Sequence, residues 1–140
     1  MNTDRLLDAW KRWVERGTSL PVAMRDSEQI KVYPGVYIEG DSVSRFESGG
    51  VADGNTFTVE WDTKLVTTPA SEDQEGTIKA QHDTLRNTLA FQIQSDLAES
   101  WMDGQIGIRV FQLLANSPET TEADGYRVTT WKLTAISCPV

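Results

Sequence analysis

The spacing of the apolar residues changes from helical to alternating along this chain, so it must fold into both helices and strands. Near the N-terminus the apolar side chains fall at i, i+1, i+4, i+7 and i+8, the spacing of an amphipathic helix: Leu6, Leu7, Trp10, Trp13 and Val14. Thr3 is a possible N-cap and Gly17 a stop signal. The pattern predicts a helix over residues 4–16.

Further along, the period becomes two, which is typical of half-buried strands. Strands are predicted over 30–39 and 55–67, with one face made of Ile30, Val32, Val36, Ile38, Phe57, Val59, Trp61 and Leu65. Pro34 cannot donate to a strand ladder, so the first of these strands lies at an edge or begins at the proline. Residues 40–54 contain four glycines and are expected to form a loop.

Residues 72–103 are predicted to be helical. Ser71 is a candidate cap, and Ile78, His82, Leu85 and Leu89 recur at near-helical spacing. Residues 89–94 fit a helix or a strand; we favour a helix, a break near Gln94 and a short third helix.

A C-terminal hairpin is predicted over 106–138. Ile106, Ile108 and Val110 alternate in its first strand, and residues 116–125 form its polar loop. We therefore expect one α+β domain over 1–140, with an antiparallel sheet of about four main strands and two or three helices packed mainly on one face.

Charge and cysteine content exclude some functional classes. The 140 residues carry a net charge of −8, the wrong sign for a protein that neutralises phosphates, so sequence-specific nucleic-acid binding is not expected. The single cysteine, Cys138, permits no intrachain disulfide. No signal-peptide pattern and no run of apolar residues long enough to span a membrane occurs, so synthesis in the cytoplasm and no membrane partner are expected.

Catalytic signatures are sparse. The one histidine, His82, neighbours Asp83, but adjacent helical residues point apart, so a packed histidine is the favoured interpretation. No metal-ligand set, phosphate-binding glycine run or nucleophile elbow is present, and Asp73, Glu75 and Gly76 do not continue into a calcium loop. A pair of carboxylates brought together by folding remains possible, because glycosidase acids have no fixed sequence spacing. We expect no enzyme activity and no cofactor.

The acidic residues gather in three connecting segments, 39–54, 71–76 and 116–125. They form either a solvated rim or a charged surface that repels DNA or binds a basic partner, depending on whether they converge in space. Four of the five tryptophans, Trp10, Trp13, Trp61 and Trp131, fall on predicted inner faces, which favours core packing.

The order of these elements resembles that of tail-terminator and tail-completion proteins, which join heads to tails in tailed bacteriophages. The resemblance covers about residues 6–138. It rests on the first helix, YPGVYIEGDS at 33–42, the glycine-rich segment, TFTVEW at 56–61, His-Asp-x-Leu-Arg at 82–86 and the closing hairpin.

The resemblance implies a virion protein of the neck, a homo-oligomeric ring, often a hexamer, that caps the tail tube, binds head-connector proteins and needs no cofactor. DNA would pass through such a ring. The segments 40–54 and 116–125 are then the candidate subunit or partner interfaces, represented by Arg45, Phe46, Glu47, Asp53, Glu119, Glu122 and Asp124. Alternatives are a connector, a stopper or a minor tail subunit and, from other classes, a small carboxylate-dependent hydrolase or a monomeric ligand-binding domain.

Overall fold

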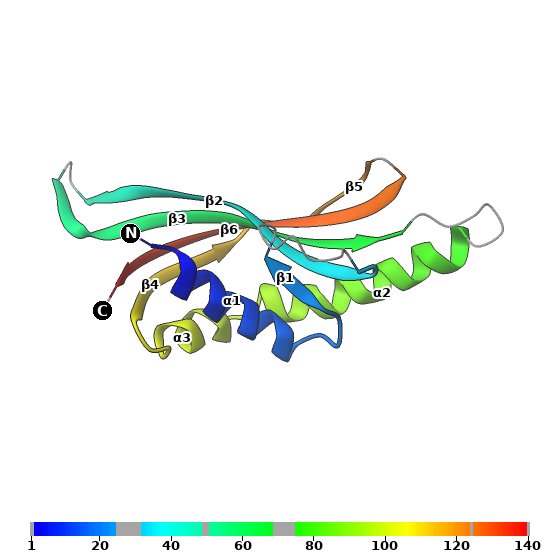
Figure 1. Cartoon of the computed structure of the whole chain (residues 1–140), viewed down its shortest axis with the longest axis horizontal. Helices are drawn as coiled ribbons and strands as arrows, with labels where there is room; N and C mark the ends of the chain where they lie inside the picture. Colours follow the sequence, from blue (N-terminus) through cyan, green and yellow to red (C-terminus); the bar gives the residue numbers. More distant parts are fainter. Residues whose placement is uncertain (1, 25–31, 49–50, 69–74, 124, 140) are drawn as a thin grey trace.

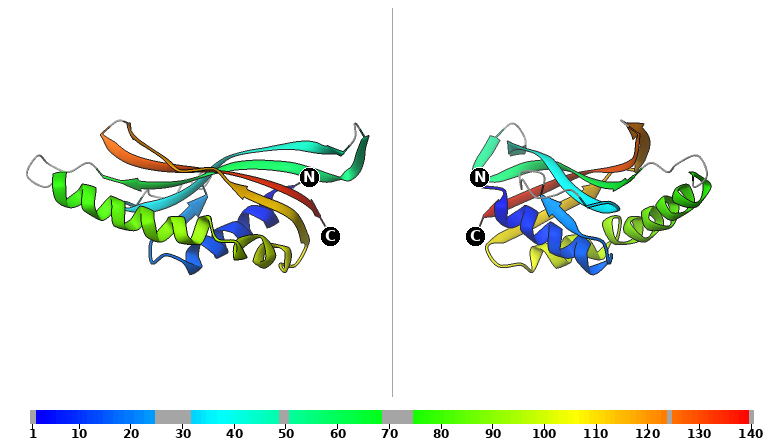
Figure 2. Two further views of the ribbon diagram at one scale, coloured as in Figure 1. Left: turned by 180° about the vertical axis from the view of Figure 1, so that it is seen from behind. Right: turned by 45° about the vertical axis from the view of Figure 1, so that its right-hand side comes forward.

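The computed structural model describes residues 2–24, 32–48, 51–68, 75–123 and 125–139. It is an α+β structure in which three helices lie on one face of a twisted, elongated six-stranded sheet (Figure 1). No helix formed by the described residues lies on the opposite face in any of the three views (Figure 1 and Figure 2). The elements in chain order are α1 (Asp4–Arg16), β1 (Val22–Met24), β2 (Gly35–Ser48), β3 (Val51–Thr67), α2 (Glu75–Ile93), α3 (Leu97–Asp103), β4 (Ile108–Ala115), β5 (Glu119–Ala123) and β6 (Tyr126–Pro139).

The sheet has the strand order β1-β2-β3-β6-β4, with β5 also paired to β6. All pairings are antiparallel except β1 with β2, which is parallel. The α+β class and the helices on one face are confirmed. The sheet contains more strands than the sequence predicted. It is mixed because β1 pairs with β2 in parallel, and β1 is only three residues long, too short to show an alternating pattern.

The prediction of a loop over 40–54 was wrong for most of its length. β2 continues to Ser48 and pairs with β3 from Ser42↔Glu60 to Ser48↔Val51, forming a long hairpin. The glycines accommodate irregularities within it: Gly40 has a φ of 71° and lies at the register shift between Glu39 and Ser42. We call residues 41–48 and 51–56 the β2–β3 arm, since Phe57↔Ser137 is the first pairing of β3 with β6.

The loop predicted over 116–125 was also wrong in part. β5 occupies Glu119–Ala123 and continues the course of β4 along the same side of β6, with which it pairs up to Ala123↔Tyr126. Ile106 is 94% exposed and precedes the strand, which begins at Ile108. Gly107, with a φ of 86°, separates them, so the alternating pattern starts one step later than predicted.

The helical predictions and the role of the proline are confirmed. α1 has the predicted bounds, and α2 ends at Ile93, which resolves 89–94 as helix up to a break at Gln94. β2 begins immediately after Pro34, so the strand predicted over 30–39 was wrong for residues 32–34, and Val32 is 51% exposed rather than on the inner face. Ile30 and Ser71 lie outside the described residues. Thr3 precedes α1 but makes no side-chain cap; its hydroxyl donates to Asp41 Oδ2 at 2.7 Å instead.

The core lies between the helices and the covered face of the sheet. Trp10, Trp61 and Trp131 are fully buried and Trp13 nearly so, as predicted. Trp10 and Trp61 pack edge to face with ring centroids 5.7 Å apart. Burying one such ring removes about 150–250 Å² from water, about 4–6 kcal/mol before the entropy of ordering is subtracted. The tryptophans therefore fix α1 against the middle of the sheet.

Candidate interaction surfaces

The sequence-predicted interface residues lie at opposite ends of the sheet. Arg45 and Phe46 are in the β2–β3 arm, and Glu47 and Asp53 belong to its two strands. Glu119 and Glu122 are on β5, which pairs with β6 where β6 meets the far end of β3, at Thr67↔Arg127. Figure 1 shows the strands of the arm, where β2 ends and β3 begins, at one end of the sheet and β5 at the other. Asp124 lies outside the described residues.

The acidic segments therefore do not form one surface. Segment 39–54 is mostly the arm, and 116–125 is mostly β5 and the connection before it. Of 71–76, the first four residues are outside the described structure. Negative charge is thus distributed to separate ends, which gives the molecule two distinct charged regions rather than a continuous acidic face.

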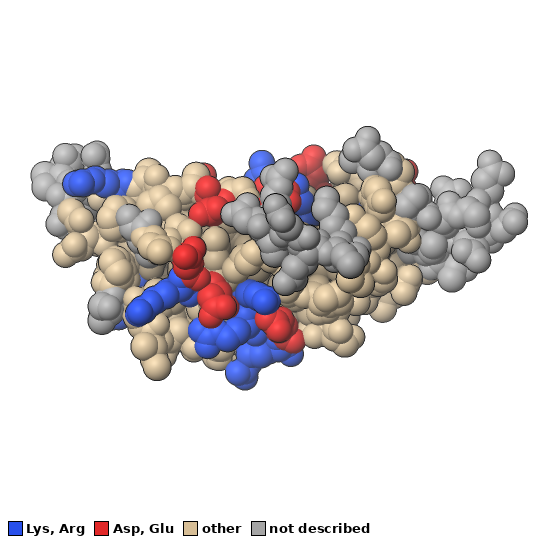
Figure 3. All heavy atoms as spheres, in the orientation of Figure 1, with Lys and Arg blue, Asp and Glu red and all other residues tan. Residues whose placement is uncertain are grey.

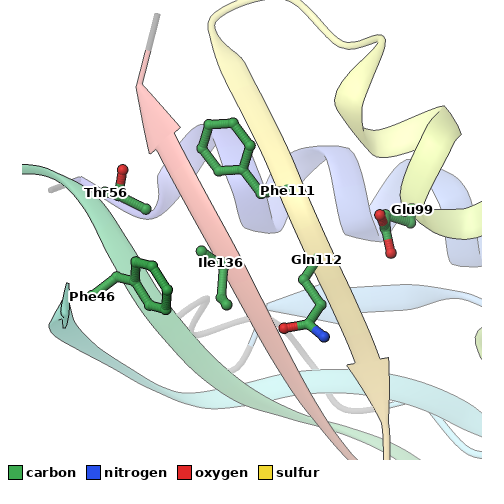
Figure 4. Close-up of a pocket in the computed structure, with 6 residues that line it drawn as sticks. All are labelled: Phe46, Thr56, Glu99, Phe111, Gln112 and Ile136. Atoms are coloured by element: carbon green, nitrogen blue, oxygen red, sulfur yellow. The ribbon is translucent and has the colours of Figure 1, made fainter. Parts of the chain in front are cut away.

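A shallow hollow of about 460 Å³ lies at the base of the arm. Its lining comes from four strands and α3 (Figure 4): Phe46, Thr56, Ile136, Phe111, Gln112 and Glu99. Phe111 is 50% exposed, at a register shift where β4 bulges between Val110 and Gln112. The hollow is lined both by Phe46, which was predicted from the sequence as an interface residue, and by Phe111, which was not predicted. The inward alternation of Ile108 and Val110 places Phe111 on the opposite side, and that signal could have identified it.

The outer edge of β4 is closed by acidic side chains of α3. The N–H of Val110 donates to Asp103 Oδ1 at 2.8 Å, and the N–H of Leu113 donates to Glu99 Oε2 at 3.2 Å. The hydrogen bond from Val110, with help from Arg109, holds the pKa of the Asp103 carboxyl below its usual value. These carboxylates occupy donors that an added strand would use, which is a common protection of edge strands.

His82 is fully buried where α2 packs on β3 and β6. Its Nδ1 is 2.8 Å from Thr67 Oγ1 and its Nε2 is 2.7 Å from Thr129 Oγ1. Burial, and then the charge of Arg127, lower the pKa of His82 to about 4. A neutral imidazole can donate with one nitrogen and accept with the other, so both hydroxyls are satisfied. The prediction of a packed histidine is confirmed.

A basic and aromatic surface lies where α1 meets α3. Lys and Arg side chains gather over α1, with Asp and Glu side chains among them (Figure 3). The Arg16 guanidinium lies 5.5 Å from the Trp101 ring centroid, and that of Arg12 lies 5.9 Å from it. Arg12 also forms an exposed ion pair with Asp8 at 3.3 Å. This surface neutralises itself in part and holds α1 against α3.

A second hollow, of about 570 Å³, lies between the start of α1 and β2. Its polar lining is mainly acidic: Asp4, Asp8, Glu39 and Asp41, with Arg5 as the basic member. Among the residues whose side-chain burial the structure describes, no Asp or Glu is buried. Within the described residues, no three His, Cys, Asp or Glu side chains are grouped so that they could hold a metal ion. The facing buried acids that would mark a carboxylate-dependent hydrolase are thus not found among these residues.

No described helix is both long and apolar enough to cross a membrane.

Comparisons with known proteins add little. No family model matches the chain, and no curated protein matches it. One solved structure, known only by a sequence identifier, aligns over 96% of this chain and 96% of its own, at 16% sequence identity and a TM-score of 0.41. A likeness at that TM-score carries no argument about fold or function.

Proposed function

We propose that this chain is a structural subunit of the neck of a tailed bacteriophage, a tail-terminator-like protein that assembles into a ring. In this role its copies bind one another side by side, cap the tail tube and join it to the head connector. The sequence resemblance suggests this class. The structural observation that supports it is the separation of two exposed regions, the β2–β3 arm and β5, at opposite ends of one sheet.

Two different contact regions on one subunit are what a ring requires. A head-to-tail contact joins one surface of a subunit to a different surface of the next, and it closes into a ring when the rotation between subunits allows. A contact that uses the same surface twice would stop at a dimer. The arm and β5 supply unlike surfaces, since the arm carries Arg45 among acidic residues and an exposed Val43, whereas β5 carries Glu119 and Glu122 and no basic residue.

Open, shallow hollows also fit a protein that works by assembly. The described hollows lie at the base of the arm and beside α1, and each is lined by side chains from several elements. Phe111 and Leu114, on β4, remain about half exposed, at 50% and 53%. Exposed aromatic and aliphatic side chains next to polar ones are typical of protein contacts.

Native mass spectrometry tests whether the chain forms a ring. We expect a single closed oligomer, a hexamer by the resemblance. Arg45→Glu or Glu122→Lys alone is expected to weaken it about tenfold, and the two together to restore it in part, since the charges are exchanged. Glu15→Lys, on the exposed face of α1, is the matched control and should leave the mass unchanged. A strict monomer that binds no tail tubes would contradict the ring.

Electron microscopy of phage particles made without the protein tests the role in the virion. A terminator predicts tails of abnormal length that are not joined to heads. Tails of normal length already attached to heads would exclude that role. Tails of normal length that remain detached would instead assign the chain to a connector, which is the nearest alternative within the same class.

A further inference from the structure

The edges of the sheet differ in how well they are closed. β4 is closed by Glu99 and Asp103 of α3. β1 covers β2 only along Val36–Ile38. Within the described part of the chain, no strand pairs with the outer side of β2 at Ser42–Phe46 or with the outer side of β5. The sheet therefore has one edge that side chains protect, at β4, and two outer strand stretches, on β2 and β5, that no described strand covers.

The open stretch of β2 is less protected than β4: Arg45 is its one charged residue, and register shifts lie only at its ends. Ser42–Phe46 contains neither lysine nor proline, and Val43 is 39% exposed although it pairs with the buried Val59. Open edges with exposed apolar side chains accept a strand from another chain, because their free N–H and C=O groups pair with it. At β4, by contrast, side chains of α3 accept hydrogen bonds from the backbone N–H groups of the edge. The edge of β2 is therefore the one that remains available to pair with another strand.

We propose that the open edge of β2 at Ser42–Phe46 binds β5 of a second copy of this chain, extending the sheet from one subunit to the next. This inference rests on the proposed ring function and names the contact that builds the ring. The occupant is a second copy because the same molecule carries both open edges, with opposite charge: Arg45 on one, and Glu119 and Glu122 on the other.

The direction of the strands supports an antiparallel contact. Strands β2, β3, β6 and β5 alternate in direction across the sheet, so β5 followed by β2 of the next subunit continues the alternation. β5 and the open part of β2 lie at opposite ends, so neighbouring subunits are staggered along the strands. Continuous sheets that close into rings have such a stagger between strands.

The faces of the two strands match in this contact. Arg45 pairs with Phe57, and Glu122 pairs with Arg127, both on the side of the sheet that carries the helices. Ser44, opposite Thr58, and Thr121, opposite Val128, lie on the helix-free side. Joining the edges therefore places arginine and glutamate on one side and small hydroxyl side chains on the other.

Disulfide trapping between separately labelled copies tests the contact. In a Cys138→Ser background, Ser44→Cys and Thr121→Cys are made as separate proteins and mixed under mild oxidation. Facing residues in an antiparallel pair have Cα atoms within the range that a disulfide spans. Ser42→Cys and Glu119→Cys complete a panel of four pairings that covers neighbouring registers on the same face. Thr88→Cys, exposed on α2, replaces either partner as the control.

The proposal expects linked dimers only in mixtures that combine a β2 cysteine with a β5 cysteine, at least tenfold above the Thr88→Cys control. Ser44→Cys protein that links to itself would show a symmetrical β2 contact and overturn the inference. Absence of linkage in all four mixtures at the highest soluble concentration would overturn it as well.

An edge-blocking variant separates this inference from the proposed function. Val43→Lys places a charge on the open edge, and we expect at least a tenfold loss of oligomer by native mass, with Thr88→Lys as the control. A ring that forms normally with Val43→Lys and without cross-links disproves the strand contact but leaves the ring function standing. Cross-links between β2 and β5 cysteines, together with normal phage tails in particles made without the protein, would support the strand contact and exclude the proposed role in the virion.

Discussion

The imidazole of His82 is hydrogen-bonded to Thr129, with Nε2 and Oγ1 2.7 Å apart, where α2 packs against β6. Thr129 Oγ1 is in turn 2.8 Å from Thr120 Oγ1 on β5. A buried polar chain of this kind ties a helix and two strands together, and it depends on the imidazole being neutral. The protonation state of one residue is thus linked to the stability of the fold.

Stability is expected to fall as the pH drops from about 6.5 towards 4. The pKa of His82 is lowered from 6.5 to about 4 in the folded protein, so in this window the unfolded chain binds a proton that the folded chain does not. At 1.36 kcal/mol for each pH unit, the full difference is on the order of 3 kcal/mol. Urea unfolding at pH 7 and pH 4.5 measures it. His82→Asn should have a smaller loss between these pH values; equal losses would contradict the prediction.

Replacing Trp10 by Phe should cost more than the same change at Trp61. The indole N–H of Trp10 donates to Thr63 Oγ1 at 2.8 Å, whereas the N–H of Trp61 is buried and has no hydrogen-bond partner among the described residues. Both changes lose ring area, but only the first leaves a buried hydroxyl without its donor. We expect a difference of about 1–2 kcal/mol in the free energy of unfolding. Equal costs in urea titrations would show that the bond contributes nothing net.

Asp103→Ala is expected to reopen the edge of β4. The change frees the N–H of Val110, so its hydrogen exchange should accelerate, and the protein should aggregate more readily. Asp96→Ala, at the other end of α3, is the control, since Asp96 makes no side-chain cap. Because the pKa of Asp103 is lowered on folding, its contribution is present at neutral pH and lost as acid protonates it. Unchanged exchange at Val110 would contradict the role.

Gly107→Ala and Gly104→Ala should have opposite effects. Gly107 has a φ of 86°, and a methyl group there would contact the side chain of Arg5, so we expect a loss of at least about 1 kcal/mol. Gly104 has a φ of −81°, and a methyl group there would make only ordinary contacts, 3.5 Å from the backbone oxygen of Trp101, so alanine should be neutral or stabilise by up to about 1 kcal/mol. The melting temperatures of both variants measure these effects. An unchanged melting temperature for Gly107→Ala would show that the backbone at this position relaxes.

Much of the framework could be predicted from local patterns. Helix α1 and the buried tryptophans follow from apolar spacing, since a stripe of large apolar side chains must be removed from water wherever it occurs. The inner faces of β3 and β6 follow for the same reason. His82 could be identified as packed, but its partners Thr67 and Thr129 could not, because they are far from it in sequence.

The sequence by itself determined the α+β class, the helix ends and which residues enter the core, because these depend on short-range spacing and burial. Only the tertiary structure decided that 41–48 and 119–123 are strands, since polar side chains on both faces leave no alternation to detect. The parallel pairing of β1 and the closure of β4 by α3 likewise depend on contacts between distant segments. Which edges of the sheet remain open is therefore a property of the fold, set by backbone pairing rather than by local pattern.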